Sequence, residues 1–373
     1  MEKITIKEVT TKKDLRIFIY LPEKIHRNDP DWLPPIYMDE WSLFDRKKNN
    51  AFSYSDAILL LAIKENRIAG RIMGIINKKY NNITGDEHAR FGFIECIDDQ
   101  KVFHALISRI EEWAKQKGMG KIVGPLGFSD KDPQGFQFEG FGQPPFITSP
   151  TNSPYMIRLI AAEGYTKKID LVNYLGKMPE EFPPVYERAM SRLKANHEFN
   201  VIQFPNKKAL KPYIIPVLEL MNEAFADIYA FVPLTDEEKV DLAKNYFPIL
   251  DPKFVTVIEK EGQLVGFAVG IPDPSPGIKA CRGRLYPFGI FKLLREIKKS
   301  KKLLMMLGGI RKEFRGNGFD VLMGARILQE GIKNGMETID SHLVLEDNLK
   351  MRGEYERIGC EVVKRFRIYQ KEL

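Results

Sequence analysis

The chain has 373 residues, of which 44% are hydrophobic and 29% are charged, and its formal net charge is +7. This balance excludes a disordered or fibrous chain and predicts a globular protein with a sizeable core, long enough for two domains. No run of eighteen apolar residues occurs, and the charged start MEKITIKEVTTKKD lacks the apolar block of a signal peptide. We therefore expect a cytoplasmic protein without a membrane span.

The reactive residue types give little support to metal chemistry. Cys96, Cys281 and Cys360 form no CxxC pair, and the five histidines form no HExxH pattern. We expect reduced, structural cysteines and no metal site. A modest positive charge spread over a long chain also describes an ordinary solvated surface, so charge alone does not indicate a nucleic-acid partner.

Two predicted β-hairpins indicate that the chain repeats itself. AILLLAIKENRIAGRIMGII at 57–76 and KFVTVIEKEGQLVGFAVGI at 253–271 each show an apolar run, a polar turn and a second apolar run. Their matching glycines are Gly70 and Gly266, which lie 266 − 70 = 196 positions apart. The repeat length is therefore about half the chain.

Later segments follow the same order. FHALISRIEEWAKQKGM and VLMGARILQEGIKNGM each predict an amphipathic helix that ends at a glycine, Gly118 or Gly335, and a strand-like segment follows each. Asn152 and Asn348 then begin similar segments, again 348 − 152 = 196 positions apart. We interpret this as a tandem repeat; the alternative is a coincidental likeness of two αβ domains.

The prolines of MPEEFPPVYERAMSRLKANHEFN place the domain boundary near residue 195. The expected domains are 1–195 and 196–373. The second is expected to contain a strand, helices at 209–226 and 235–247, the hairpin, the strand LLMMLGGI, a helix, the strand TIDSHLVLE, a helix and the final strand EVVKRFRIYQKEL. That order predicts an α/β sheet protein.

A loop with two glycines, KEFRGNGFDVLMGARIL at 312–328, connects the strand ending at Ile310 to a helix. Several backbone N–H groups meet at such a helix N-terminus, which is a favourable place for a phosphate. Gly316 and Gly318 permit positive φ and close approach, and basic side chains stand beside them. The alternative interpretation is a structural turn.

This loop resembles the acyl-CoA pyrophosphate loop of the GNAT superfamily, the Gcn-related N-acetyltransferases, whose pattern Gln/Arg-x-x-Gly-x-Gly/Ala is met by Arg315 and Gly318. Downstream, Asn348, Tyr355 and Gly359 have the spacing of the family's second signature. The resemblance covers the second half well and the first half weakly. It implies two tandem GNAT-like domains, each with a mixed, mostly antiparallel sheet flanked by helices, and acetyl-CoA or another acyl-CoA as the cofactor.

The resemblance also implies roles for particular residues. The strand would line the pantetheine arm and polarise the thioester, the loop would hold the pyrophosphate, and Tyr355 would protonate the departing thiolate. Tyr355 as a packed aromatic and Asn348 as a helix cap are the structural alternatives. The expected cofactor-binding residues are Leu307, Gly308, Gly309, Ile310, Arg311, Arg315, Gly316, Asn317, Gly318, Phe319, Asp320 and Asn348.

Three features depart from the family pattern or leave it incomplete. Asp320 stands where glycine or alanine is usual, so it should cap the helix or pair with an arginine. His342 and Glu346 on TIDSHLVLE should share one face of a strand and are the candidates for the general base. The first half has Asp98 and Asp99 in place of the glycine pair, with Ile160 at the tyrosine position, and is expected to bind no CoA.

Two insertions accompany the repeats. In the first half, an irregular segment contains phenylalanines that would line a cleft or fill the space between the halves: Phe128, Phe136, Phe138, Phe141 and Phe146. In the second half, a basic amphipathic stretch could meet a nucleic acid, an anionic lipid or the CoA 3′-phosphate, or could be a solvated helix face: Lys292, Arg295, Lys298, Lys299, Lys301 and Lys302.

The resulting hypothesis is an acyl-CoA-dependent N-acyltransferase that transfers an acetyl group to a small-molecule or peptide amine, with one active site in the C-terminal half. The alternatives are a non-catalytic binding protein that keeps the fold, marked by Asp320, and an aminoacyl-tRNA-dependent transferase of the Fem type. The sequence does not reveal the acceptor, the acyl length or the oligomeric state.

Overall fold

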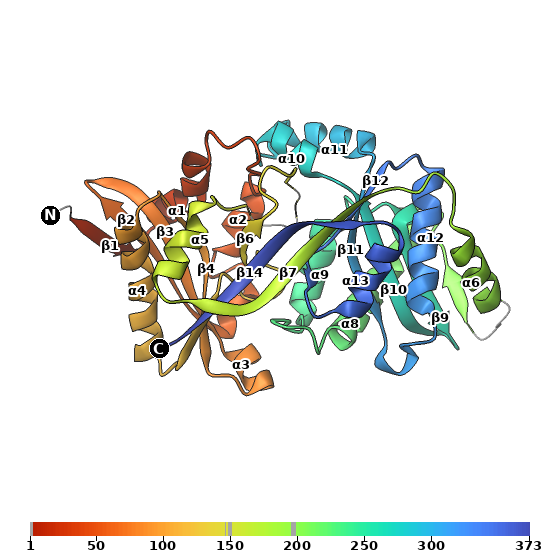
Figure 1. Ribbon diagram of the computed structural model, residues 1–373, viewed down its shortest axis with the longest axis horizontal. Helices are drawn as coiled ribbons and strands as arrows, with labels where there is room; N and C mark the ends of the chain where they lie inside the picture. The colour runs from red at the N-terminus through yellow and green to blue at the C-terminus, as the bar shows by residue number, and fades with distance from the viewer. Residues whose placement is uncertain (1–2, 146, 148–150, 195–198) are drawn as a thin grey trace. The chain divides into compact units, whose positions relative to one another are not determined.

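The structure is a computed structural model that describes residues 3–145, 147, 151–194 and 199–373. The chain forms two compact units (Figure 1). Unit 1 consists of Met1–Val172, Ile278–Leu293 and Val363–Leu373, and unit 2 of Asn173–Gly277 and Leu294–Val362. The boundary expected near residue 195 lies outside the described residues, so the linear division there stays a prediction.

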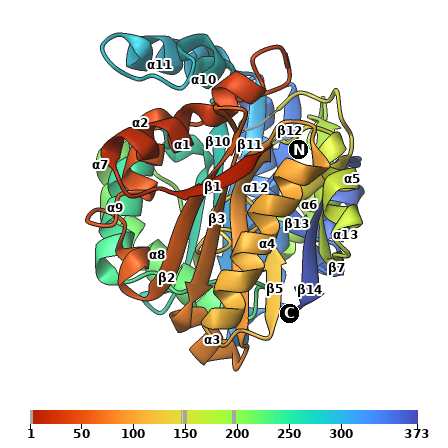
Figure 2. The same ribbon diagram turned by 90° about the vertical axis from the view of Figure 1, so that its left-hand side faces the viewer.

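Unit 1 is a mixed sheet with helices packed on it (Figure 2). Its strands β1 to β4 are antiparallel neighbours, β4 and β5 are parallel, and the end of β14 is antiparallel to β5. The elements are β1 (Ile4–Glu8), α1 (Lys12–Ile25), α2 (Tyr37–Leu43), β2 (Ser55–Lys64), β3 (Arg67–Asn77), α3 (Lys78–Thr84), β4 (His88–Cys96), α4 (Gln100–Gln116), β5 (Lys121–Gly124), β6 (Phe136–Glu139), α5 (Tyr155–Ala162), most of β7 (Thr166–Lys177) and most of β14 (Glu361–Glu372).

Unit 2 has the same sheet order. Strands β8 to β11 are antiparallel neighbours, β11 and β12 are parallel, and the end of β7 is antiparallel to β12. The elements are α6 (Pro184–Lys194), β8 (Asn200–Ile202), α7 (Lys207–Leu210), α8 (Ile214–Ala224), α9 (Asp236–Tyr246), β9 (Val255–Lys260), β10 (Gln263–Pro272), β11 (Lys302–Ile310), α12 (Phe319–Lys333), β12 (Thr338–Ser341), β13 (Val344–Leu345) and α13 (Leu349–Arg357). Two further helices, α10 (Ser275–Cys281) and α11 (Gly289–Lys299), contribute residues to both units.

The predicted fold class is confirmed, and so is the common order of strands and helices in the two halves. The exception is the last strand. Residues 369–372 of β14 pair with β5 in unit 1, while residues 175–177 of β7 pair with β12 in unit 2. Each unit therefore completes its sheet with a strand end from the other half of the chain. Alternating apolar residues predict a strand but do not identify the strand that pairs with it. For this reason we expected the last strand, β14, to belong to the sheet of the second half.

The two glycines that revealed the repeat differ in how closely a helix packs on them. A Cβ atom at Gly70 would lie 2.8 Å from Leu106 of α4, and a Cβ atom at Gly266 would lie 3.4 Å from Met323 of α12. The contact at Gly266 is an ordinary van der Waals distance, whereas Gly70 is required for the close approach of α4 to the sheet. In unit 1 that helix buries a full apolar face, including Val102, Phe103, Leu106, Ile107 and Ile110, and burying each such side chain contributes about 1.5–3 kcal/mol.

We expect unit 1 to lose stability in mild acid through His88. This histidine is buried on β4, and burial, with a smaller effect from Arg90, lowers its pKa to about 4. Because the pKa in the unfolded chain is about 6.5, the unfolded state takes up the proton first. The free energy of unfolding is therefore unaffected by the titration of His88 above pH 6.5. It falls by roughly 2–3 kcal/mol as the pH falls toward 4.

Urea unfolding followed by tryptophan fluorescence tests this, because Trp32, Trp41 and Trp113 all belong to unit 1. His88→Gln should flatten the loss of unfolding free energy between pH 7 and pH 5. An equal pH dependence in the variant and the wild type would assign the effect to other groups.

Candidate functional site

Strand β11 continues beyond its partner β12. Residues Lys302–Met305 pair with Thr338–Ser341, but β11 extends to Ile310. Its register against β10 shifts at Val269/Gly270, where Leu307 and Met305 are consecutive partners, so Met306 is the extra residue of a β-bulge. Among the described residues, the β12-facing backbone groups of 307–310 have no strand partner. The Ile310 carbonyl accepts from Arg315 Nε at 3.3 Å, and the other outward-facing groups are available to a ligand that lies in an extended conformation.

The four predicted strand residues differ in their surroundings. Leu307 packs against the core of unit 2, and Ile310 is half-buried. Gly308 is exposed, whereas a Cβ atom at Gly309 would lie 2.9 Å from Phe267 and 3.0 Å from Ala224. Gly309 is therefore required for close packing of α8 on the strand, and Gly308 leaves the outer surface open.

The loop after β11 has the predicted conformation. Gly316 and Gly318 adopt left-handed φ angles of 86° and 79°, and Gly318 is the N-cap of α12. The side chain of Phe319 is buried, with its ring 4.9 Å from that of Phe199 and 6.4 Å from that of Phe314. This packing fixes the first helical turn, whose amides have no acceptor within a helix. Only the backbone of Phe319 is placed to meet a ligand.

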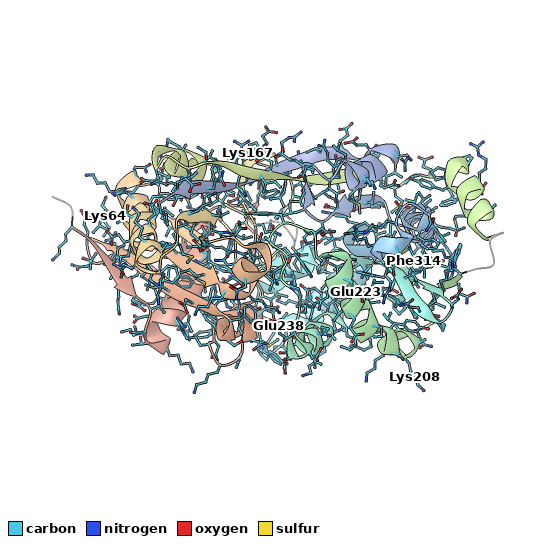
Figure 3. The ribbon with its side chains drawn as sticks, turned by 90° about the horizontal axis from the view of Figure 1, so that it is seen from below. Lys64, Lys167, Lys208, Glu223, Glu238 and Phe314 are labelled. Atoms are coloured by element: carbon cyan, nitrogen blue, oxygen red, sulfur yellow. The ribbon has the colours of Figure 1, made fainter. Side chains whose placement is uncertain are left out.

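Basic side chains surround the loop but are partly neutralised by carboxylates. Arg311 pairs with Glu223 at 2.9 Å and donates to the Leu264 carbonyl. Figure 3 shows Glu223 and Phe314 in this part of unit 2. Arg315 donates to the Ala224 carbonyl at 2.8 Å and lies 3.9 Å from Asp227.

Lys312, Asn317 and Asp320 complete the loop, and each has a partner within unit 2. Lys312 lies 3.8 Å from Asp227, and the Asn317 side chain donates to the Phe314 carbonyl. Asp320 is exposed, and its carboxylate accepts a hydrogen bond from the Val321 N–H at 2.9 Å. The carboxylate therefore caps an amide of its own helix, which is one of the two arrangements that the sequence predicts for it.

The second predicted motif, Asn348, Tyr355 and Gly359, lies along and around α13. Asn348 is its N-cap, with the side-chain oxygen accepting from the Met351 N–H at 3.2 Å. Asn348 is thus a helix cap, which was the structural alternative. Its role toward the cofactor arm stays a prediction. Tyr355 is half-buried and stacks on Tyr174, with 5.4 Å between ring centroids and 14° between planes. Burial raises the pKa of Tyr355, so its phenol stays protonated at neutral pH.

The predicted strand TIDSHLVLE is interrupted, which corrects one argument about the general base. Strand β12 ends at Ser341, and the next strand residues are Val344–Leu345, so His342 and Glu346 both lie outside regular strand. Alternation along one strand therefore does not place them on one face. The His342 N–H donates to the Met305 carbonyl at 3.0 Å, which puts His342 where β11 and β12 diverge. The base roles of both residues stay predictions.

A polar network beside Tyr355, buried at Asn173 and exposed at Glu356, was missed from the sequence. The Asn173 amide donates to Asp340 at 2.8 Å and to the Ser341 carbonyl at 2.7 Å. Tyr174 accepts from Arg352 at 2.9 Å and donates to Glu356 at 2.6 Å. The available signal was an asparagine within the apolar run LVNYL at 171–175, because an amide buried in a strand needs partners.

In unit 1 the segment that corresponds to the glycine loop contains Asp98 and Asp99 before α4. Asp99 accepts from the Lys101 and Val102 amides and so caps α4, and its pairing with Lys64 lowers its pKa. A pocket of about 620 Å³ lies next to it. Its lining includes three basic side chains that the sequence did not bring together, so this end of unit 1 is not purely acidic: Leu21, Lys24, Ile25, Arg27, Asn28, Arg67, Ile68, Ile97, Asp98 and Tyr155.

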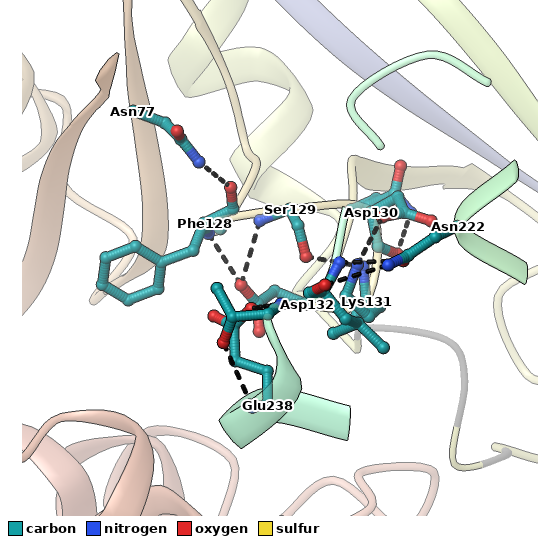
Figure 4. Close-up of polar contacts among 12 residues, drawn as sticks. Asn77, Phe128, Ser129, Asp130, Lys131, Asp132, Asn222 and Glu238 are labelled. Carbon is teal, nitrogen blue, oxygen red and sulfur yellow. Dashed lines mark hydrogen bonds and ion pairs between the residues drawn. The ribbon is translucent and has the colours of Figure 1, made fainter. Parts of the chain in front are cut away.

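The phenylalanine-rich insertion is ordered by hydrogen bonds within the segment and from Asn77 (Figure 4). Asp132 accepts from the Phe128 N–H at 2.7 Å and the Ser129 N–H at 3.3 Å, and Asn77 donates to the Phe128 carbonyl. Phe128 and Phe136 belong to the core of unit 1.

The other phenylalanines of the insertion differ from these two. Phe138 lies under the Arg367 guanidinium at 4.5 Å, and Phe141 is 40% exposed. Phe146 lies outside the described residues. At least two of the five predicted phenylalanines thus pack within one unit.

Comparison with known structures identifies the fold. No family model matches the chain. A tandem GNAT protein from the clavulanic acid biosynthesis pathway has a TM-score of 0.57, covering 99% of this chain and 98% of that one at 13% identity. Two repeats with the same strand order agree with this likeness. The chain has the fold of tandem GNAT proteins.

Two bacterial relatives extend along nearly the whole chain. Protein YghO of Escherichia coli (strain K12) is 27% identical over 379 residues, which cover 99% of this chain and 95% of the relative. Bacterial ceramide synthase of Caulobacter vibrioides (strain NA1000 / CB15N) is 28% identical over 379 residues, covering 99% and 98%.

Proposed function

We propose that the chain is an acyl-CoA-dependent N-acyltransferase with its active site in unit 2, and that its acceptor is the amine of a long-chain amino alcohol. The observation that carries the proposal is the open edge of β11 at residues 307–310, which leads directly into the glycine loop at the start of α12. The tandem GNAT fold supports the reaction class. The relative named bacterial ceramide synthase supports the acceptor, because a ceramide is the amide of a fatty acid with a long-chain amino alcohol.

The residues present fit an acyl-CoA. Amides at the start of α12 would hold the pyrophosphate, with Gly316 and Gly318 permitting close backbone approach. Arg311 and Arg315 would contribute positive charge, reduced by their carboxylate partners. The backbone of 307–310 would accompany the pantetheine arm and polarise the thioester carbonyl.

In the reaction, the amine nitrogen forms a bond to the thioester carbon, the carbon–sulfur bond breaks, and the nitrogen loses a proton. Tyr355 would donate a hydrogen bond to the departing sulfur. Burial raises its pKa above that of a free tyrosine, so the phenol keeps its proton and acts on the sulfur as a hydrogen-bond donor. His342 and Glu346 stay the candidates for accepting the amine proton, His342 being the one at the divergence of β11 and β12.

A thiol-release assay tests the proposed function. The purified protein is mixed with acetyl-CoA or palmitoyl-CoA and with sphinganine or a short primary amine, and the amide product is identified by mass spectrometry. We expect free CoA to appear only when a thioester and an amine are both present, and fastest with palmitoyl-CoA and sphinganine. CoA binding without thiol release from any pair would favour a non-catalytic protein, and co-purified tRNA would favour the Fem-type alternative.

A further inference from the structure

Three exposed aromatic residues lie close together in the sequence, two in the connection between α10 and α11 and one in the first turn of α11. Tyr286, Phe288 and Phe291 expose 77%, 71% and 67% of their surfaces. In the part of the chain that the structure describes, they and Leu349 are the most exposed large apolar side chains. Single exposed apolar residues are ordinary on a protein surface, but a local group of this size marks a contact site. We call Tyr286, Phe288 and Phe291 the aromatic tip.

The segment just before the aromatic tip is firmly held. Arg284 forms a two-pronged ion pair with Glu23 of α1, the shortest distance being 2.8 Å, and its guanidinium lies 4.8 Å from the Tyr37 ring centroid. The Tyr37 N–H donates to the Gly283 carbonyl at 2.9 Å. A Cβ atom at Gly283 would lie 2.0 Å from the Pro35 carbonyl oxygen, so the segment packs too closely for another residue. The residues next to the aromatic tip are therefore held in place, and the tip is exposed beside an ordered segment.

Helix α11, seen as a ribbon in Figure 2, follows the start of the aromatic tip in the sequence. It carries a basic face. Leu293 is buried, whereas four basic side chains are exposed: Lys292, Arg295, Lys298 and Lys299. Phe291, Arg295 and Lys298 have i, i+4 and i+7 spacing and so share one side of the helix. The helix carries one acidic residue, Glu296, which pairs with Lys299 at 3.1 Å. The helix thus has four cations and one anion, a net charge of +3.

We propose that the aromatic tip and the basic face of α11 dock on an anionic lipid surface. Aromatic side chains enter the boundary between headgroups and acyl chains, while lysine and arginine reach the anionic headgroups. A second copy of the chain fits less well, because a two-fold contact would oppose two basic faces. Double-stranded nucleic acid would meet the basic face and leave the aromatic tip without a partner.

The purpose of this docking rests on the proposed function, since a membrane is where a long-chain amino alcohol resides. The docking itself needs no turnover and can be measured alone. Vesicles of phosphatidylcholine mixed with phosphatidylglycerol should bind the protein and sediment with it, more weakly at high salt. Vesicles of phosphatidylcholine alone should bind it poorly, because the electrostatic attraction is missing.

Two variants separate the two parts of the surface. Phe288→Ser/Phe291→Ser should weaken binding to mixed vesicles about tenfold or more, because two apolar side chains are lost from the boundary region. Lys292→Ala/Arg295→Ala should weaken it about thirtyfold and reduce its salt dependence, since each basic side chain near an anionic surface contributes roughly a factor of five.

Matched controls change exposed residues on α1 and α3 of unit 1. Ile83 is 58% exposed on α3, so Ile83→Ser removes an exposed apolar side chain, and Lys12→Ala/Lys13→Ala removes two charges from α1. Both controls should bind vesicles like the wild type, and all four variants should keep the wild-type unfolding temperature.

The proposal is overturned if the wild type does not sediment with mixed vesicles, or if both surface variants bind as well as the controls. It is also overturned if the tip variants lose an RNA oligonucleotide or a dimer and leave vesicle binding intact. Vesicle binding that depends on the tip, in a protein that releases no thiol from any acyl-CoA, would keep the docking surface and reject the proposed function.

Discussion

Replacing Gly318 by valine is expected to abolish CoA binding, with affinity falling at least about a hundredfold in calorimetry. Gly318 has φ of 79° at the N-cap of α12, a conformation that a β-branched residue resists. The changed loop would withdraw amides from the pyrophosphate. Two lost hydrogen bonds to a charged group, each worth about 1.5–3 kcal/mol, account for the expected loss.

The matched control is Gly335→Val, just beyond the other end of the same helix. Gly335 has φ of 69°, and a Cβ atom there would meet nothing within 4 Å, so valine brings comparable backbone strain without touching the loop. Both variants should lose roughly 1–2 kcal/mol of unfolding free energy. Only Gly318→Val should lose CoA, and Asp320→Ala should bind it somewhat more tightly because a carboxylate beside the pyrophosphate is removed.

The basic pocket of unit 1 provides the competing location. Arg27→Ala/Arg67→Ala removes two of its cations and should leave CoA affinity unchanged if the ligand binds at 311–320. Loss of binding in that variant, together with full binding in Gly318→Val, would move the cofactor site to unit 1 and reduce the glycine loop to a structural turn.

Local features of the chain were predictable because each has a local cause. The hairpins follow from alternating apolar residues, and the loop conformation follows from two glycines that alone tolerate its positive φ angles. The repeat was visible because Gly70 and Gly266 occupy matching places in β3 and β10, the second strand of each hairpin. The Asn348 cap was visible because asparagine before a helical run satisfies free amides.

Features that depend on distant parts of the chain were not predictable. The exchange of strand ends joins residues 369–372 to β5 and residues 175–177 to β12, and no local pattern encodes either pairing. Tyr174 meets Tyr355 across 181 positions because of that exchange, which brings the end of β7 into unit 2. The break after Ser341 was hidden because Val344 and Leu345 are themselves good strand residues.

Replacing Tyr355 by phenylalanine is expected to lower the turnover number about a hundredfold or more with little change in the apparent affinity for acyl-CoA. A hydrogen bond to the departing sulfur matters only as negative charge develops, and loss of a general acid has an effect of this size or larger. The phenol is protonated at neutral pH and can donate a hydrogen bond to the sulfur, although burial raises its pKa and makes it a weaker acid. Its ring is held in place by stacking on Tyr174.

Tyr174→Phe is the control that separates chemistry from packing. It removes the hydroxyl that accepts from Arg352 and donates to Glu356, and it keeps the ring that stacks on Tyr355. Its main effect should be a loss of about 0.5–1.5 kcal/mol of unfolding free energy, because two partly exposed hydrogen bonds are lost. Tyr355→Phe should show the opposite profile, with a large loss of turnover and a small change in stability. Full activity in Tyr355→Phe, measured by thiol release with the best acceptor amine, would remove the tyrosine from the mechanism and leave water as the proton donor.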